Sequence, residues 1–214
     1  MIKDREICVK SSFGHTIRNW FFYHEPGTGF LAVLFPGAGN SCDFPPLDYA
    51  RKAALDLGFD VLSLEYGYYR TGNLYRPDFM NDILIECNAA VDECRSNTEY
   101  QKIVFISKSM GTVAAGEIGG LPGYKDVFHV FLTPVKKTIP YIRRAPCAVI
   151  YGTADPLLTK EDAELIKGIL HADVLEIEGA SHSLGDMSNY KKSLEMLKIA
   201  TEHVEKTLRS VISG

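Results

Sequence analysis

Six runs of consecutive apolar residues, separated by segments with helical periodicity, are the feature that most constrains how this chain can fold. The runs are continuous rather than alternating, which is typical of strands covered on both faces in a parallel sheet. Strands alternating with amphipathic helices in this order predict right-handed crossovers around a mostly parallel sheet. The runs are 30–35, 59–64, 103–106, 127–132, 147–151 and 174–177.

Two further strands are expected near the amino terminus, at 6–10 and 16–23, joined by Ser12-Phe13-Gly14-His15 as a hairpin connection. The sheet should therefore begin antiparallel and hold roughly eight strands, with helices on both faces. No repeat, low-complexity segment or linker interrupts the pattern, so residues 1–214 are expected to form a single domain. Helices are expected at 49–57, 78–95, 159–170 and 187–208, the third opening with the capping box Thr159-Lys160-Glu161-Asp162.

Charge and composition make several function classes improbable. The net charge of −4 offers no excess of positive charge to nucleic acid, and no apolar stretch approaches the roughly 18 residues of a membrane span. The five cysteines are scattered without a CxxC pair, which favours reduced thiols and a cytoplasmic location. No metal-ligand spacing, phosphate-binding glycine loop or nucleotide fingerprint is present, so neither a metal nor a cofactor is expected.

Ligands of such a sheet bind beyond the carboxyl ends of its strands, so the loops that leave strands carry the functional information. The loop Phe35-Pro36-Gly37-Ala38-Gly39-Asn40 can expose backbone N–H groups, as a developing oxyanion requires. Taken alone it is equally typical of any tight turn.

The stretch Ser107-Lys108-Ser109-Met110-Gly111 follows another strand and precedes a helix of small residues. A turn tight enough to project its middle side chain needs small residues two positions before and after it. Ser107 and Gly111 meet that need around Ser109, whereas Phe105 would violate it if Ser107 were the projecting residue. Helix capping is the alternative role for these serines.

Two later loops supply an acid and an imidazole. Asp155 follows the strand at 147–151 and could orient a histidine, although Asp-Pro is also common as a turn or cap. His182 lies among small residues in Gly179-Ala180-Ser181-His182-Ser183, where it could act as a general base or could simply be solvated.

Together these four loops resemble the α/β-hydrolase superfamily over nearly the whole chain. The chain order Ser, Asp, His after successive strands, with the glycine-containing loop upstream, carries the resemblance. Two departures are that Pro36 stands where many relatives have histidine and that Ser107 replaces a usual glycine. The matching motifs are Pro36-Gly37-Ala38-Gly39, Ser107-Lys108-Ser109-Met110-Gly111, Gly152-Thr153-Ala154-Asp155 and Gly179-Ala180-Ser181-His182.

The resemblance implies the α/β-hydrolase fold and a role for each matched residue. Ser109 would be the nucleophile, His182 the general base and then acid, and Asp155 the orienting carboxylate. The backbone N–H groups of Ala38 and Met110 would form the oxyanion hole.

A serine nucleophile implies acyl transfer to water, with a small-molecule carboxylic ester as the expected substrate. Relatives with other chemistry differ at this position: dehalogenases and epoxide hydrolases use aspartate, and dienelactone hydrolases use cysteine. The alternatives are a thioesterase or acyltransferase, or a non-catalytic ligand-binding protein on the same fold. Many members of this superfamily carry a lid domain after the sixth strand. Here only about a dozen residues, 134–146, separate the sixth strand from the seventh, so no large lid domain is expected.

Two further segments are weaker indicators of function. The tyrosine- and arginine-rich loop 66–76 could place Tyr68 and Arg70 against substrate, or it could pack onto the body of the protein. Lys136, Lys137, Arg143 and Arg144 are typical of a solvated face, with binding of phosphorylated or acyl-CoA substrates as the alternative. The sequence predicts no oligomeric state.

Overall fold

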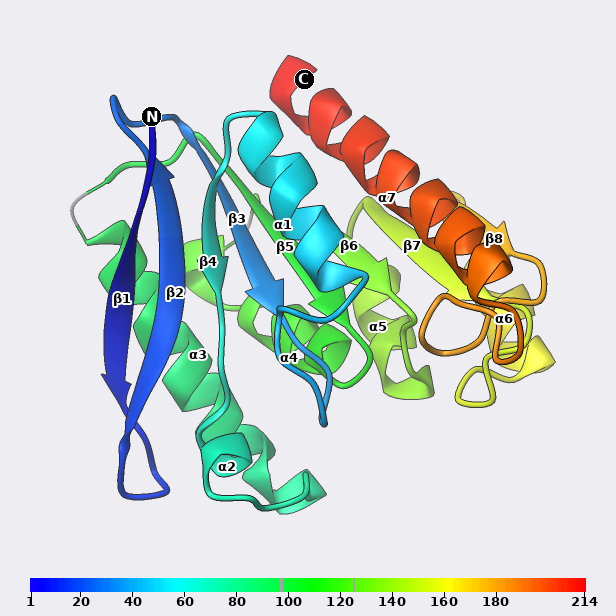
Figure 1. Cartoon of the computed structure of the whole chain (residues 1–214), viewed down its shortest axis with the longest axis horizontal. Coiled ribbons are helices and arrows are strands. Elements are labelled where there is room, and N and C mark those ends of the chain that lie inside the picture. The colour runs from blue at the N-terminus through cyan, green and yellow to red at the C-terminus, as the bar shows by residue number, and fades with distance from the viewer. Residues whose placement is uncertain (97, 125) are drawn as a thin grey trace.

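An eight-stranded sheet organises the chain in the computed structural model, which describes residues 1–96, 98–124 and 126–214 (Figure 1). The strand order is β1-β2-β4-β3-β5-β6-β7-β8. The β1–β2 and β2–β4 pairs are antiparallel and all later pairs are parallel, as the change from alternating to continuous apolar runs predicts. The strands are Ile2–Lys10 (β1), Thr16–His24 (β2), Phe30–Phe35 (β3), Asp60–Ser63 (β4), Lys102–Lys108 (β5), Phe128–Leu132 (β6), Cys147–Gly152 (β7) and Ala172–Ile177 (β8).

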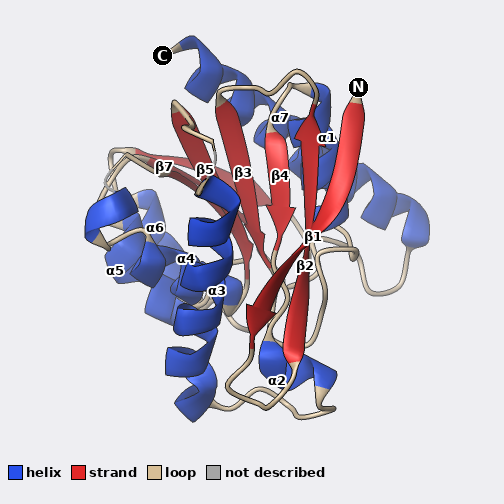
Figure 2. Cartoon of the chain, turned by 90° about the vertical axis from the view of Figure 1, so that its left-hand side faces the viewer, coloured by secondary structure: helices blue, strands red, loops and turns tan. Residues whose placement is uncertain are grey.

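Helices cover both faces of this sheet (Figure 2). On one face α1 and α7 pack against the even-numbered apolar residues of β3 and β5. On the other face α3 and α4 pack against the odd-numbered residues, and α5 and α6 continue that layer over β6 and β7. The α-helices are Leu47–Asp56 (α1), Gly67–Arg70 (α2), Met80–Arg95 (α3), Gly111–Ile118 (α4), Ile139–Ile142 (α5), Lys160–Lys167 (α6) and Tyr190–Ser213 (α7).

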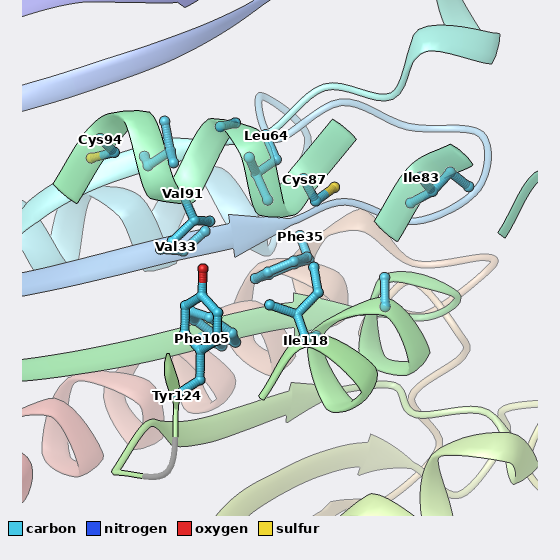
Figure 3. Close-up of a cluster of buried hydrophobic side chains, with 14 of the residues drawn as sticks. Val33, Phe35, Leu64, Ile83, Cys87, Val91, Cys94, Phe105, Ile118 and Tyr124 are labelled. Carbon is cyan, nitrogen blue, oxygen red and sulfur yellow. The ribbon is translucent and has the colours of Figure 1, made fainter. Parts of the chain in front are cut away.

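The core beneath α3 and α4 shows how burial fixes this arrangement (Figure 3). Phe35 and Phe105 pack with ring centroids 4.9 Å apart, and both side chains are fully buried. Burying a side chain of this size stabilises the fold by about 1.5–3 kcal/mol relative to leaving it in water. Cys87 and Cys94 lie on the buried face of α3, as the helical periodicity predicts.

The edges of several elements differ from the sequence expectation. β1 begins at Ile2 rather than at residue 6, because backbone pairing with β2 continues where the side chains are charged and exposed. Thr159 caps the amino terminus of α6 as expected, since its hydroxyl accepts the Asp162 N–H at 3.2 Å. The last helix starts at Tyr190 because the Asn189 side chain accepts the N–H groups of Lys191 and Lys192 in the first turn of α7.

The parallel strands bring four loops to one edge of the sheet: those after β3, β5, β7 and β8. Between β6 and β7 the chain forms only a 3₁₀ turn (Lys136–Thr138) and α5, so no large lid is inserted there. Among the described residues, no helix is both long enough and apolar enough to cross a membrane.

Candidate active site

Ser109 occupies the sharp turn between β5 and α4. Its φ of 54° lies in the left-handed region, which a residue other than glycine rarely adopts and which costs about 1–3 kcal/mol. Gly111 permits the turn, because a Cβ there would lie 2.3 Å from the carbonyl oxygen of Pro36. A Cβ on Gly37 would lie 3.4 Å from the Ser109 Cβ, so the loop after β3 packs directly against this serine.

A chain of hydrogen bonds links the three side chains expected to act together. The His182 Nε2 lies 2.8 Å from the Ser109 Oγ, and the His182 Nδ1 lies 2.7 Å from the Asp155 Oδ2. The other carboxylate oxygen of Asp155 accepts the Leu157 N–H at 2.9 Å, and this side chain is fully buried. Both oxygens are therefore held, which fixes the carboxylate toward the imidazole.

The loop after β3 presents the backbone groups expected to receive an oxyanion. Within residues 1–96, 98–124 and 126–214, neither the Ala38 N–H nor the Met110 N–H donates an intramolecular hydrogen bond. The carbonyl groups of the loop do have partners: the Tyr66 hydroxyl donates to the Pro36 oxygen at 2.8 Å, and the Tyr68 hydroxyl donates to the Ala38 oxygen at 2.6 Å. The loop is thus fixed from its carbonyl side.

This geometry corrects the expectation that Tyr68 contacts substrate. Tyr68 is fully buried, and its hydroxyl supports the Ala38 carbonyl group, so its ring has no free surface for a ligand. Arg70 forms an ion pair with Glu65 at 2.9 Å. It also lines a separate cavity of about 250 Å³, together with Pro36. A role for Arg70 in substrate binding stays a prediction.

A larger cavity of about 600 Å³ opens beside Ser109. Its volume lies within the usual range for small-molecule sites, and most of its lining is apolar. The wall comes from the segment before α3, from α4 and from the β6–β7 connection. The lining residues are Tyr75, Pro77, Met80, Ser109, Met110, Val113, Glu117, Val135, Lys137, Pro140, Tyr141 and Leu157.

The basic residues of the β6–β7 connection disperse in the fold. Lys137 lines the large cavity, whereas Lys136 lies 3.6 Å from Asp162. Arg144 lies over the Tyr141 ring and donates to the Gly116 oxygen at 3.0 Å. Lys136, Lys137 and Arg144 therefore have different surroundings rather than sharing one site.

Sequence reasoning missed the cavity wall and one charged residue next to the serine. Apolar residues such as Met80 and Val113 fit helix periodicity alone, so nothing in the pattern marks them as cavity residues. Lys108 lies inside the matched motif, but its spacing carries no information on where its side chain goes. No group of three or more His, Cys, Asp or Glu side chains that could hold a metal occurs among the described residues.

Several solved structures share this architecture at low sequence identity. Est1E from Butyrivibrio proteoclasticus is 12% identical, with a TM-score of 0.73 over 98% of this chain and 99% of that one. The Pyrococcus furiosus esterase Pf2001 is 14% identical, with a TM-score of 0.75 over 98% and 93%. XC6422 from Xanthomonas campestris, described as a serine hydrolase without a lid, is 14% identical, with a TM-score of 0.68 over 96% and 94%. No protein-family model and no curated protein matches the sequence significantly. At these identities the likeness concerns architecture, and this chain has the α/β-hydrolase fold.

Proposed function

We propose that the protein is a serine hydrolase that cleaves small carboxylic esters through an acyl-enzyme intermediate. The observation that carries the proposal is the hydrogen-bonded series Ser109, His182 and Asp155 at the mouth of an apolar cavity. Esterases among the structural neighbours also favour an ester substrate.

In the first half of the reaction, the Ser109 Oγ attacks the ester carbonyl carbon while the His182 Nε2 takes the hydroxyl proton. The carbonyl oxygen becomes negatively charged and receives hydrogen bonds from the Ala38 and Met110 N–H groups. Asp155 keeps the imidazole oriented and stabilises its charged form. The imidazolium then gives its proton to the leaving alcohol, and the acyl group stays on Ser109.

In the second half, His182 accepts a proton from water as the water oxygen attacks the acyl-enzyme. Collapse of the second tetrahedral intermediate returns the proton to Ser109 and releases the carboxylic acid. The cavity beside Ser109 would receive an apolar acyl group of modest size, since its lining offers mainly aliphatic and aromatic side chains.

The test is covalent labelling with a fluorophosphonate followed by peptide mapping. We expect wild type to be labelled at Ser109 and Ser109→Ala to be unlabelled. Ser107→Ala is the matched control, because Ser107 lies in β5 two residues before Ser109 but is fully buried, and its hydroxyl donates to the Val130 oxygen. We expect that variant to retain labelling.

An unlabelled wild type, under conditions in which a known serine hydrolase reacts, would contradict the proposal and favour a non-catalytic ligand-binding protein. If labelling succeeds, matched ester and thioester substrates with the same acyl group separate an esterase from a thioesterase.

A further inference from the structure

The cavity beside Ser109 lies on the acyl side of the candidate site. In the proposed reaction His182 gives its proton to the leaving alcohol, so the alcohol has to lie next to the imidazole. The cavity wall includes Ser109 and Met110, whereas His182 is not part of it. The cavity is therefore placed to hold the acyl part of an ester, and its lining indicates which acyl groups fit.

One face of α4 forms a long wall of this cavity. Met110, Val113 and Glu117 line it at three- and four-residue spacing, so they share that face. Glu117 follows Ser109 by about two helical turns, a distance of about 12 Å along a helix axis. Helical side chains lean back toward the amino terminus, so we expect the Glu117 carboxylate roughly 10 Å from the nucleophile. The wall is thus apolar near Ser109 and acidic at its far end.

The Glu117 carboxylate is held in place by a neighbouring tyrosine. The Tyr141 hydroxyl donates to the Glu117 Oε1 at 2.6 Å. Burial, together with this hydrogen bond, raises the pKa of Tyr141 to about 12, so the hydroxyl keeps its proton and acts as the donor. The Tyr141 ring packs against Gly116, where a Cβ would collide with it, and the Arg144 guanidinium lies over the ring.

This arrangement leaves one oxygen of Glu117 available. Among the interactions of residues 1–96, 98–124 and 126–214, the Glu117 Oε2 accepts no hydrogen bond. An ionised carboxylate has room for several donors, and here its direction is fixed through Oε1. The Oε2 is therefore a prealigned acceptor on the cavity wall.

A second charge on the cavity wall has the opposite sign. Lys137 comes from the 3₁₀ turn between β6 and β7 and is exposed, and it pairs with no carboxylate in the part of the chain that the structure describes. An ionised group in the cavity would be attracted by one of Glu117 and Lys137 and repelled by the other. A neutral hydroxyl can donate to the Glu117 oxygen without that repulsion.

We propose that the substrate carries an apolar acyl group about six to eight carbon atoms long, with a hydroxyl at its far end that donates to the Glu117 carboxylate. Three bonds of an extended chain span about 3.6 Å, so about eight bonds cover the distance from Ser109. The inference rests on the proposed function, because it names the substrate class of the same site.

The experiment compares two esters of the same alcohol, one with an ω-hydroxyoctanoyl group and one with a nonanoyl group, in which a methyl replaces the hydroxyl. The measured quantity is the ratio of their kcat/KM values, hydroxyl over methyl, in wild type and in Glu117→Met. Both values come from one preparation, so the ratio does not depend on how much of a variant is folded. We expect a ratio above one in wild type and a ratio about three- to tenfold lower in Glu117→Met.

A second variant and a shorter substrate pair serve as controls. Lys137→Met removes the other charge from the same cavity by the same kind of replacement, so it should keep the wild-type ratio. A glycolyl and a propanoyl ester place the hydroxyl and methyl too close to Ser109 to reach Glu117. The ratio for this short pair should therefore be the same in wild type and in Glu117→Met.

Four results would overturn the inference. They are a wild-type ratio of one or less, a ratio that Glu117→Met leaves unchanged, an equal fall of the ratio in Lys137→Met, and faster turnover of an ω-carboxyoctanoyl ester, which would assign recognition to Lys137. A wild type that is labelled at Ser109 but cleaves neither long ester would also contradict it.

Failure of the proposed function has a different signature. A wild type that fluorophosphonate does not label would contradict the hydrolase itself, and the acyl preference with it. Labelling at Ser109 together with any of the overturning ratios would contradict the acyl preference alone.

Discussion

The strained backbone of Ser109 depends on residues that leave space for it. A left-handed conformation presents the hydroxyl above the sheet, and the neighbouring chain has to pass close by to brace it. Gly111 provides the closest approach, with the carbonyl oxygens of Phe35 and Pro36 lying where a side chain would otherwise begin. A glycine two residues after the serine is therefore required by contact with β3 rather than by its own φ.

Replacing Gly111 with alanine tests this contact. The new Cβ would lie 2.3 Å from the Pro36 oxygen and 2.5 Å from the Phe35 oxygen, so the loop after β3 must move away from Ser109. We expect a loss of about 1–3 kcal/mol in the free energy of unfolding and slower fluorophosphonate labelling. Urea unfolding and labelling rates measure both effects.

Gly39→Ala is the matched control within the same loop, since a Cβ at Gly39 would meet no atom within 4 Å. We expect it to behave as wild type. Equal labelling rates for the Gly111 and Gly39 variants would show that the close approach is not needed for reactivity.

At the scale of elements, the segment between β4 and α3 supports the loop that follows β3. Tyr66 and Tyr68 project from this segment and donate to two carbonyl groups of the loop. Fixing the carbonyl side leaves the N–H side free to face the serine. The turn formed by α2 thus has a structural purpose that its tyrosine-rich composition does not reveal.

Tyr68→Phe removes one of these hydrogen bonds while leaving the ring in place. We expect the rate of Ser109 labelling to fall by about two- to tenfold, because a single neutral hydrogen bond contributes about 0.5–1.5 kcal/mol. Stability should fall by a similar free energy, since the Ala38 oxygen loses its partner. Labelling kinetics and thermal unfolding provide the measurements.

The control is Tyr69→Phe, the adjacent tyrosine. Its ring is partly exposed, and its hydroxyl makes no hydrogen bond within the described parts of the chain. A labelling rate for Tyr68→Phe equal to that of the control would remove the support role from this hydroxyl.

The elements that sequence analysis located well are those in which side-chain pattern and burial agree. β3 is found at its expected bounds because every side chain from Leu31 to Phe35 is buried. The helix expected at 49–57 is α1, which runs from Leu47 to Asp56 and so ends within one residue of the expected position, before Gly58. The sequence pattern predicts the start of β1 four residues too late, at residue 6 instead of Ile2, because an exposed edge strand needs only backbone pairing.

The site was predictable to the extent that it depends on chain order. Ser109, Asp155 and His182 follow strands in a recognisable sequence, and the fold brings them within hydrogen-bonding distance. The burial of Tyr68 and the path of the Lys108 side chain depend on contacts between segments far apart in the chain. No local pattern encodes those contacts, so the sequence could not supply them.

At the scale of the whole molecule, a buried histidine makes stability depend on pH. His129 lies on β6 with its ring stacked 5.0 Å from that of Phe131. Burial, reinforced by the positive charge of Arg144, lowers its pKa to about 4. The unfolded chain therefore binds a proton at higher pH than the folded protein does.

This difference predicts that the protein becomes less stable as the solution is acidified. The contribution of the neutral His129 to the free energy of unfolding is fully present above about pH 6.5. It is lost progressively as the pH falls toward 4, by at most about 3 kcal/mol. In His129→Gln that part of the pH dependence should disappear. Urea unfolding at pH 7 and pH 4.5 measures it, and an equally steep pH dependence in the variant would assign the effect to other groups.

The segment between β4 and α3 contacts two parts of the candidate site. Its first part holds the carbonyl groups of the Pro36–Ala38 loop, and its later part supplies Tyr75, Pro77 and Met80 to the wall of the cavity beside Ser109. A group that fills the cavity would therefore contact the same segment that holds the loop carrying Ala38, one of the two proposed oxyanion donors. The proposed hydrolase would then discriminate between acyl groups of different size through the turnover rate of each substrate more than through its binding affinity.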